Sequence, residues 1–157
     1  MPQYIYDLAD IAIEKNRGVL AVSVRDDSPL GRKLGKAPKP EENPKRRAFI
    51  AMLKARGIGF SLCEFRVNSG FGPYSGTLYI DVPYATEDPD YQLLSAALEH
   101  PDGTLKDPHV RFWVLSLSAA RAAKEARTES ARTGEYCPAE TLLSLPFRLL
   151  GSVYLGC

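Results

Sequence analysis

The sequence predicts an α+β fold, in which helices pack against an antiparallel sheet, within a single domain spanning residues 1–157. From Gly18 to Leu117 the apolar runs read strand, helix, strand, strand, helix, strand. The two middle runs, Phe60–Val67 and Thr77–Val82, alternate apolar and polar residues, which is the pattern of half-exposed strands. The glycine-rich segment Asn68–Gly76 joins them and predicts a long hairpin connection.

The first two elements are a short helix and a central strand. Apolar residues recur at helical spacing within residues 3–15, which predicts an amphipathic N-terminal helix. Gly18–Arg25 (GVLAVSVR) is almost continuously apolar and rich in β-branched residues. Such a run is typical of a central strand that is covered on both faces.

A long loop separates this strand from the next helix. Asp26–Asn43 contains three prolines and two glycines and exceeds the usual connection length, which indicates a loop that is either mobile or functional. Asn43 and Pro44 form an N-cap followed by proline at the first helical position, and the helix ends at Gly57. Asp88 and Pro89 begin the second helix of the core in the same way.

The core ends with a strand and is followed by an extension. Val110–Leu117 (VRFWVLSL) is the fourth core strand. Ser118–Arg132 is a helix with six alanines and no larger apolar residue, so it either lies lightly on the domain or meets a close-packed partner through its alanine face. The apolar run FRLLGSVYL near the C-terminus predicts an added edge strand.

This order of elements resembles the ferredoxin-like βαββαβ arrangement. The resemblance covers about residues 18–117 as a core sandwich, and it leaves an N-terminal helix and a helical and strand extension over residues 118–157. Many unrelated functions share this arrangement, so the resemblance implies a fold and no particular chemistry.

Composition indicates a cytosolic protein. Hydrophobic residues make up 45% and charged residues 25%, as in soluble globular proteins, and no apolar stretch approaches the ~18 residues of a membrane span. The acidic N-terminal segment is unlike a secretory signal. The three cysteines, Cys63, Cys137 and Cys157, are too far apart to indicate a disulfide framework or a zinc site, and we expect neither a metal nor a cofactor.

Charge is distributed unevenly along the chain. Arg25–Arg56 holds ten basic and four acidic residues, a net charge of +6, whereas Asn68–Asp107 holds one basic and seven acidic residues, a net charge of −6. The first of these regions contains a dense basic cluster that includes Arg32, Lys33 and Lys36. Such a cluster suits an acidic protein surface or the phosphates of a nucleic acid.

The glycine-rich segment adds aromatic residues to this picture. Phe71 and Tyr74 stand among its glycines, and exposed aromatic side chains supply contact area at a low entropic cost. We therefore predict a small cytosolic, non-enzymatic binding or regulatory protein that occupies a surface of a protein or nucleoprotein partner. The predicted partner-binding residues are Arg32, Lys33, Lys36, Lys45, Arg46, Arg47, Phe71 and Tyr74.

Two alternative functions stay open at this point. Tyr79 and Trp113 fall on one face of the predicted sheet, where they either stack on RNA bases or are covered by a terminal segment of the chain. A small enzyme or ligand-binding domain would instead place a pocket between the sheet and its helices, and its best residues are Glu64, Asp81, Tyr79 and His100. A homodimer, through an edge strand or the alanine face, is also left open.

Overall fold

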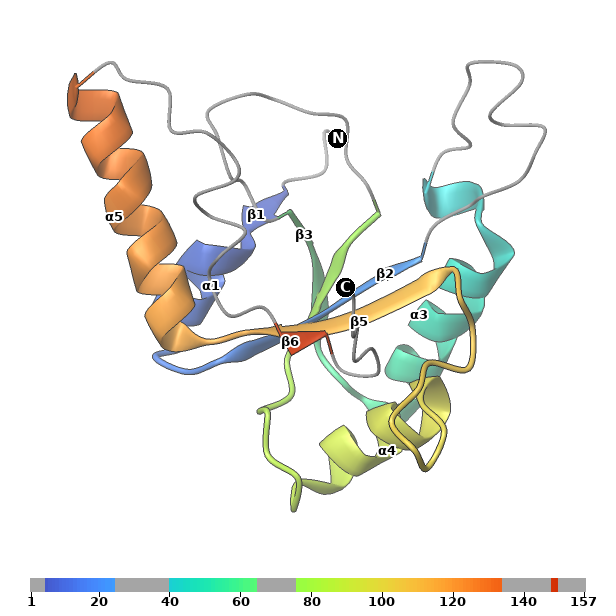
Figure 1. The fold of residues 1–157 in the computed structure, drawn as a ribbon. Coiled ribbons are helices and arrows are strands. Elements are labelled where there is room, and N and C mark those ends of the chain that lie inside the picture. Colours follow the sequence, from blue (N-terminus) through green and yellow to red (C-terminus); the bar gives the residue numbers. More distant parts are fainter. Residues whose placement is uncertain (1–4, 25–39, 65–75, 134–147, 150–157) are drawn as a thin grey trace, which may run out of the picture.

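The computed structural model describes residues 5–24, 40–64, 76–133 and 148–149, and it confirms the predicted α+β fold (Figure 1). Helices cover both faces of a single sheet. The elements in chain order are β1 (Tyr6–Asp7), α1 (Leu8–Glu14), β2 (Val19–Val24), the 3₁₀ turn η1 (Pro40–Glu42), α3 (Pro44–Arg56), β3 (Phe60–Glu64), β4 (Leu78–Ile80), α4 (Pro89–Leu98), β5 (Val110–Leu115), α5 (Leu117–Thr133) and β6 (Arg148–Leu149).

Six strands of the described residues form the sheet in the order β1-β3-β4-β2-β5-β6. β1 runs parallel to β3, and every other neighbouring pair is antiparallel. The strands joined through α3 are separated by β4, and the strands joined through α4 are separated by β2. Each crossover helix therefore spans one intervening strand.

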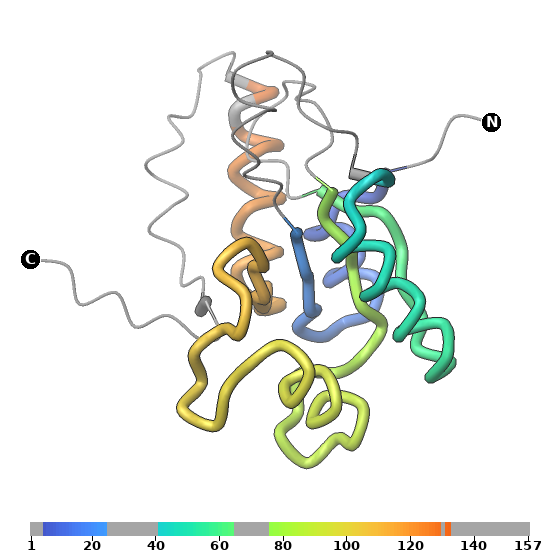
Figure 2. The backbone as a smooth tube through the Cα atoms, turned by 90° about the vertical axis from the view of Figure 1, so that its right-hand side faces the viewer, coloured from blue at the N-terminus to red at the C-terminus, as the bar shows by residue number. Residues whose placement is uncertain are grey.

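The two faces of the sheet are covered by different helices. α3 and α4 lie on one face, and α1 and α5 lie on the other (Figure 1). In the view turned by 90°, β2 lies between α5 and α3 (Figure 2). All six residues of β2 are buried, as its continuous apolar run predicted.

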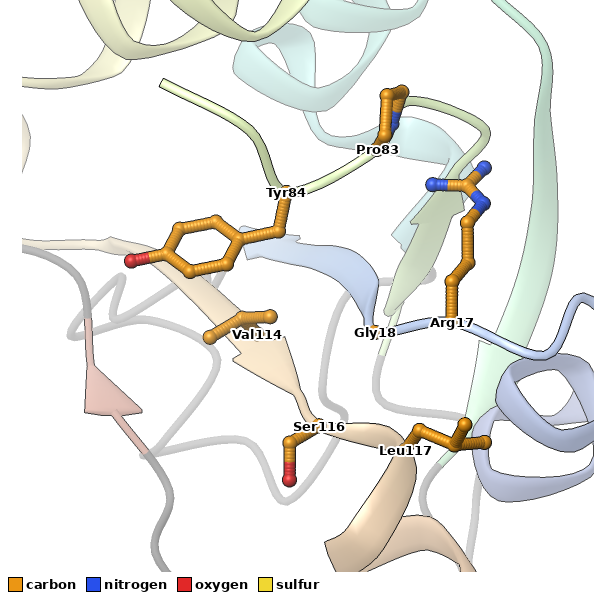
Figure 3. A pocket seen from close by; sticks show the side chains of 7 residues that line it. All are labelled: Arg17, Gly18, Pro83, Tyr84, Val114, Ser116 and Leu117. Atoms are coloured by element: carbon orange, nitrogen blue, oxygen red, sulfur yellow. The ribbon is translucent and has the colours of Figure 1, made fainter. Parts of the chain in front are cut away.

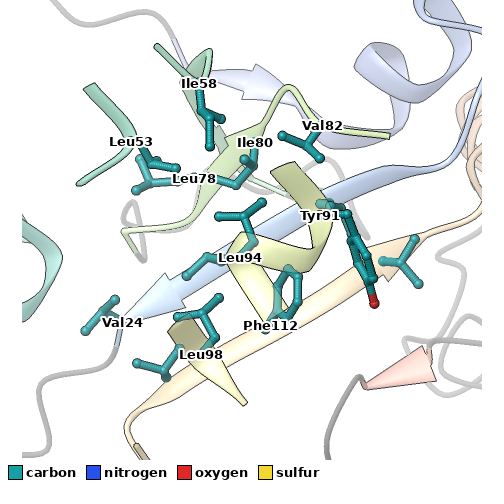
Figure 4. Packing of buried hydrophobic residues seen from close by; sticks show 14 residues of the cluster. Val24, Leu53, Ile58, Leu78, Ile80, Val82, Tyr91, Leu94, Leu98 and Phe112 are labelled. Carbon is teal, nitrogen blue, oxygen red and sulfur yellow. The ribbon is translucent and has the colours of Figure 1, made fainter. Parts of the chain in front are cut away.

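The larger core lies between the sheet and helices α3 and α4. Leu53 from α3, Leu94 from α4 and Phe112 from β5 are completely buried there (Figure 4). The ring of Tyr91 lies 6.4 Å from that of Phe112, centroid to centroid. Alternate residues of β2, β4 and β5 supply the sheet side of this core, which explains the period of two in β4.

The opposite face is covered by the N-terminal helix and the alanine-rich helix. Ala119, Ala120 and Ala123 of α5 are buried, and α5 packs directly on α1. Small side chains let two helix backbones approach closely, so a helix whose buried side chains are alanines can still be held here. The alanine face thus meets another helix of the same chain.

The predicted helix ends are confirmed. The side chain of Asn43 accepts hydrogen bonds from the backbone N–H groups of Lys45 and Arg46 at 2.9 and 3.1 Å, and Asp88 caps α4 in the same way. Gly57 ends α3 with φ at 69°, a left-handed conformation that glycine adopts without steric cost.

The N-terminal helix is shorter than predicted. Tyr6 and Asp7 pair with Cys63 and Glu64 as a short strand, and α1 begins only at Leu8. The Asp7 carboxylate accepts from the Ala9 N–H at 2.8 Å, and this cap sets the boundary.

In the C-terminal extension, β6 pairs with β5 at the sheet edge, where an added strand was expected. Across the described ranges, the structure shows no helix with the length and apolar character needed to cross a membrane.

Candidate functional site

The strands that flank the basic segment and the glycine-rich aromatic segment meet at one end of the sheet. The registers align Val22 of β2 with Leu78 of β4, and Leu78 with Leu62 of β3. Val24, the last residue of β2, pairs with Val110, the first residue of β5. We call this the loop end of the sheet, where β2 and β3 finish and β4 and β5 begin.

The basic and aromatic segments are both flanked by residues of the loop end. The basic segment, residues 25–39, follows β2, and the aromatic segment, residues 65–75, follows β3 and precedes Gly76. Arg46, in the first turn of α3, donates a hydrogen bond from its Nε to the Gly76 carbonyl oxygen at 3.2 Å. This hydrogen bond links α3, which follows the basic segment, to Gly76, which follows the aromatic segment.

A second link joins α3 to the loop before β5. Lys45 Nζ forms an ion pair with the Asp107 carboxylate, and Asp107 also accepts from the His109 N–H at 2.9 Å. The hydrogen bond from Lys45, followed by that from the His109 backbone, holds the pKa of Asp107 below its ordinary value. Asp107 therefore stays ionised and fixes the N-terminus of α3 beside β5.

The predicted partner-binding residues have different positions. Lys45 and Arg47 are exposed at the loop end. Arg46 differs from the expectation of an exposed cation, because it is only 3% exposed and is bonded to Gly76. The other predicted residues, Arg32, Lys33, Lys36, Phe71 and Tyr74, lie outside the described residues.

The burial of Arg46 is indicated in the sequence by helical spacing and not by charge. Arg46 precedes Phe49, Ile50 and Leu53 by three, four and seven residues, so it lies on the apolar side of α3. Counting charges treats neighbouring cations alike, whereas helical spacing separates Arg46 from Arg47.

The sheet face that bears Tyr79 and Trp113 is covered. Tyr79 is only 4% exposed, and Trp113 packs against the same cluster of residues from α1, α5 and the sheet. Open-sheet recognition of RNA needs accessible aromatic rings. This face therefore does not offer the stacking surface, and the covering by terminal segments is confirmed.

A polar cluster centred on Asp81 lies at the other end of β4. The Tyr79 hydroxyl donates to Asp81 Oδ1 at 2.5 Å, Arg17 Nη2 donates to the same oxygen at 2.8 Å, and Lys15 Nζ donates to Oδ2 at 3.1 Å. Asp81 and Tyr79 also line a cavity of about 310 Å³ beside α1 and β3. Of the four residues predicted for an enzyme or ligand pocket, Glu64 and His100 do not line it.

The interactions in the Asp81 cluster stabilise fixed charges and do not favour proton transfer. The hydrogen bond from Tyr79, then the contacts with Lys15 and Arg17, lower the pKa of Asp81 below its ordinary value despite partial burial. Burial, followed by the hydrogen bond to Asp81, raises the pKa of the Tyr79 hydroxyl. A general acid–base pair needs pKa values near the working pH, and both of these lie further from neutrality than usual.

Replacing Tyr79 with phenylalanine tests this cluster. We expect the pKa of Asp81 to rise toward its ordinary value and the free energy of unfolding near pH 7 to fall by about 0.5–1.5 kcal/mol, because one donor to the carboxylate is lost. Since the native pKa of Asp81 is lowered, its contribution is full above the unfolded value and declines as the pH falls through the native one. Carbon-detected NMR titration of the Asp81 carboxyl and urea unfolding at pH 7 and pH 3 measure both effects. An unchanged titration in Tyr79→Phe would contradict the assignment.

The structure also describes Cys63 and most of the residues that could bind a metal ion. Cys63 is completely buried, and burial raises the pKa of its thiol, which suits a packed residue and not a nucleophile. Within the described ranges, no group of three or more histidine, cysteine, aspartate or glutamate residues is placed to hold a metal ion.

Comparison of the chain with protein-family models, with curated proteins and with solved structures returned no match.

Proposed function

We propose that the chain is a non-enzymatic binding or regulatory protein that contacts an acidic surface of a partner protein or nucleoprotein through the loop end of its sheet. The observation that carries this proposal is the convergence of the flanks of the basic and aromatic segments. The registers of β2, β3 and β4 align these flanks, and the bond from Arg46 to Gly76 joins them. Cations and aromatic side chains drawn from two distant stretches of sequence can then act on one partner.

Charge at the start of α3 supports the proposal. No acidic residue occupies the first turn of this helix, although acidic residues are favoured there by the helix dipole. Arg46 and Lys45 have bonds within the chain, to Gly76 and Asp107. Arg47 is exposed and has no ion-pair partner among the residues that the structure describes. It is therefore the cation of this turn that is best placed for an external partner.

The finer fold proposed for this protein is the ferredoxin-like core over about residues 18–117. Each of its two crossovers, β2-α3-β3 and β4-α4-β5, encloses one antiparallel strand, and this split arrangement supports that assignment. The arrangement also explains why β2 and β3 finish at the same end. They run in the same direction on either side of β4.

We favour a protein surface over nucleic acid as the main contact. The aromatic face that would stack on bases is occupied by α1 and α5, so the basic segment would have to bind a nucleic acid without base stacking from this face. A cytosolic location is part of the same proposal, and it rests on the composition and cysteine spacing.

Two paired charge variants test the loop end. Lys36→Gln with Arg47→Gln removes one cation of the basic segment and one of the first turn of α3, and Lys54→Gln with Arg56→Gln removes two cations from the opposite end of α3. In quantitative affinity capture from the native host, we expect the first pair to lower partner recovery by about 3- to 10-fold and to reduce its salt dependence between about 50 and about 200 mM. We expect the second pair to recover the partner as the unaltered protein does.

Equal recovery of the same partner by both pairs would overturn the assignment of the loop end. Nuclease treatment before capture separates the partner classes, since a protein contact survives it. Recovery that is lost on nuclease treatment, with the first pair still defective, would replace the protein partner with nucleic acid.

A further inference from the structure

A second cavity lies at the end of the sheet away from the loop end. It has a volume of about 510 Å³, and its lining comes from the start of β2, the chain after β4 and the junction of β5 with α5. Figure 3 shows Pro83, Tyr84 and the guanidinium of Arg17 on one side, Ser116 and Leu117 on the other, and Gly18 and Val114 between them. Its volume falls within the range of about 300–1,000 Å³ that is typical of small-molecule sites.

Most of the lining is apolar. Val114 and Leu117 belong to the cavity wall, and Tyr84 adds an aromatic ring. The Tyr84 side chain is 42% exposed, an unusual position for a large apolar residue, and its edge-to-face contact with Tyr91 holds the ring at a centroid distance of 5.5 Å. This exposed but fixed ring is suited to covering one face of an apolar ligand.

Arg17 brings a cationic guanidinium to one side of the cavity. Arg17 Nη2 is bonded to Asp81, while its Nη1 is buried and has no hydrogen-bond partner among the described residues. The Arg17 side chain as a whole is 29% exposed, so a ligand would reach this cation through its accessible atoms and not through Nη1. Asp81 is shared with Lys15, so two cations face one carboxylate and the cluster keeps a net charge of +1.

The start of α5 lies on the opposite side of the cavity from the Arg17 guanidinium (Figure 3). Ser116 Oγ accepts from the Ala119 N–H at 3.2 Å, and the Ser116 carbonyl accepts from Ala120. The amides of Leu117 and Ser118 come earlier in the helix and belong to the group that an α-helix leaves without an internal acceptor. Leu117 lines the cavity, so the partial positive charge of this helix start lies at the cavity edge and has the same sign as Arg17.

We propose that this cavity binds a small organic acid, with its carboxylate at Arg17 and its apolar body between Tyr84 and Val114. Arg17 is the one charged residue among the described residues that line the cavity, so its guanidinium is the group that would attract the carboxylate. This cavity is separate from the loop end, so failure of the acid-binding proposal would leave the proposed partner contact untouched, and the reverse also holds.

A matched pair of probes tests the requirement for a carboxylate on the unaltered protein. 4-Phenylbutyrate and its neutral analogue 4-phenylbutyramide have similar size and shape and differ in charge. In ¹⁵N–¹H NMR titrations up to about 10 mM, we expect 4-phenylbutyrate to shift amide signals at residues 17–18, 84 and 114–118, and the amide to bind about tenfold more weakly. Absence of shifts, shifts confined to other parts of the chain, or equal affinity for both probes would overturn the proposal.

Two variants test the assigned corner, and a third serves as the control. Arg17→Gln is expected to weaken 4-phenylbutyrate binding about tenfold, because it removes a charged donor. Lys15→Gln removes a cation from the same Asp81 cluster but lies outside the cavity lining, and we expect it to weaken binding less than threefold. Equal weakening by Arg17→Gln and Lys15→Gln would show a general charge effect and would contradict the site.

A cavity-filling variant provides a test by shape. A Cβ at Gly18 would meet its nearest neighbours, in residues 114–116, at 3.5–3.8 Å, which is ordinary contact. Gly18→Leu is therefore expected to fold and to abolish binding by occupying the space, while Gly18→Ala should retain most of it. Unchanged binding in a folded Gly18→Leu would place the ligand elsewhere. If Gly18→Leu does not fold, the comparison of acid with amide decides the proposal on the unaltered chain.

Discussion

Replacing Arg46 with methionine is expected to lower the free energy of unfolding by about 2–3 kcal/mol, because a buried charged donor is lost and the Gly76 carbonyl is left without it. Methionine retains an unbranched apolar stem, so the change isolates the guanidinium more cleanly than alanine would. Urea unfolding followed by circular dichroism measures the effect. The neighbouring exposed variant Arg47→Met is the matched control, and it should change stability by no more than about 0.5 kcal/mol.

The same variant separates the structural role of Arg46 from a contact with the partner. If Arg46 acts by aligning the two flanks, Arg46→Met should reduce partner capture as well as stability, and Arg47→Met should reduce capture alone. Equal stability of the two variants would show that the bond to Gly76 contributes nothing. The strand registers alone would then bring the two flanks together, without a contribution from this bond.

Local signals in the sequence were sufficient to predict most of the helices and strands. Asn43 before Pro44 and Asp88 before Pro89 place helix starts correctly, since a cap is decided by residues a few positions apart. The continuous apolar run of β2 predicted a strand that is buried on both faces. The boundary of the first helix was wrong because pairing with β3 decided it, and that partner lies far along the chain.

The candidate sites show where the sequence alone falls short. Lys15 and Arg17 meet Asp81 across separations of 66 and 64 residues, and no local spacing indicates such a cluster. The second cavity likewise joins the starts of β2 and α5, which become neighbours only through strand pairing. Arg46 is the opposite case, because its helical spacing from Leu53 was sufficient to indicate burial.

The alanine-rich helix poses the same problem of a distant partner, and Ala120→Leu tests which partner it has. Ala120 is completely buried at the contact of α5 with α1. Leucine has nearly the helix propensity of alanine, so the expected loss of about 1–3 kcal/mol in unfolding free energy would come from overpacking. Ala131→Leu, at an exposed position of the same helix, is the matched control and should stay within about 0.5 kcal/mol.

Measuring the stability and the solution mass of both variants distinguishes the two interpretations of this helix. If α5 packs on α1 of its own chain, Ala120→Leu should destabilise the protein at every concentration without changing its oligomeric state. If the alanine face instead joined two copies, Ala120→Leu would shift the mass in sedimentation measurements and leave the stability of the monomer unchanged. That outcome would also reopen the face of Tyr79 and Trp113, because the helix that covers it would no longer be held by α1. The contact between α5 and α1 therefore determines whether the face of Tyr79 and Trp113 is accessible to a ligand.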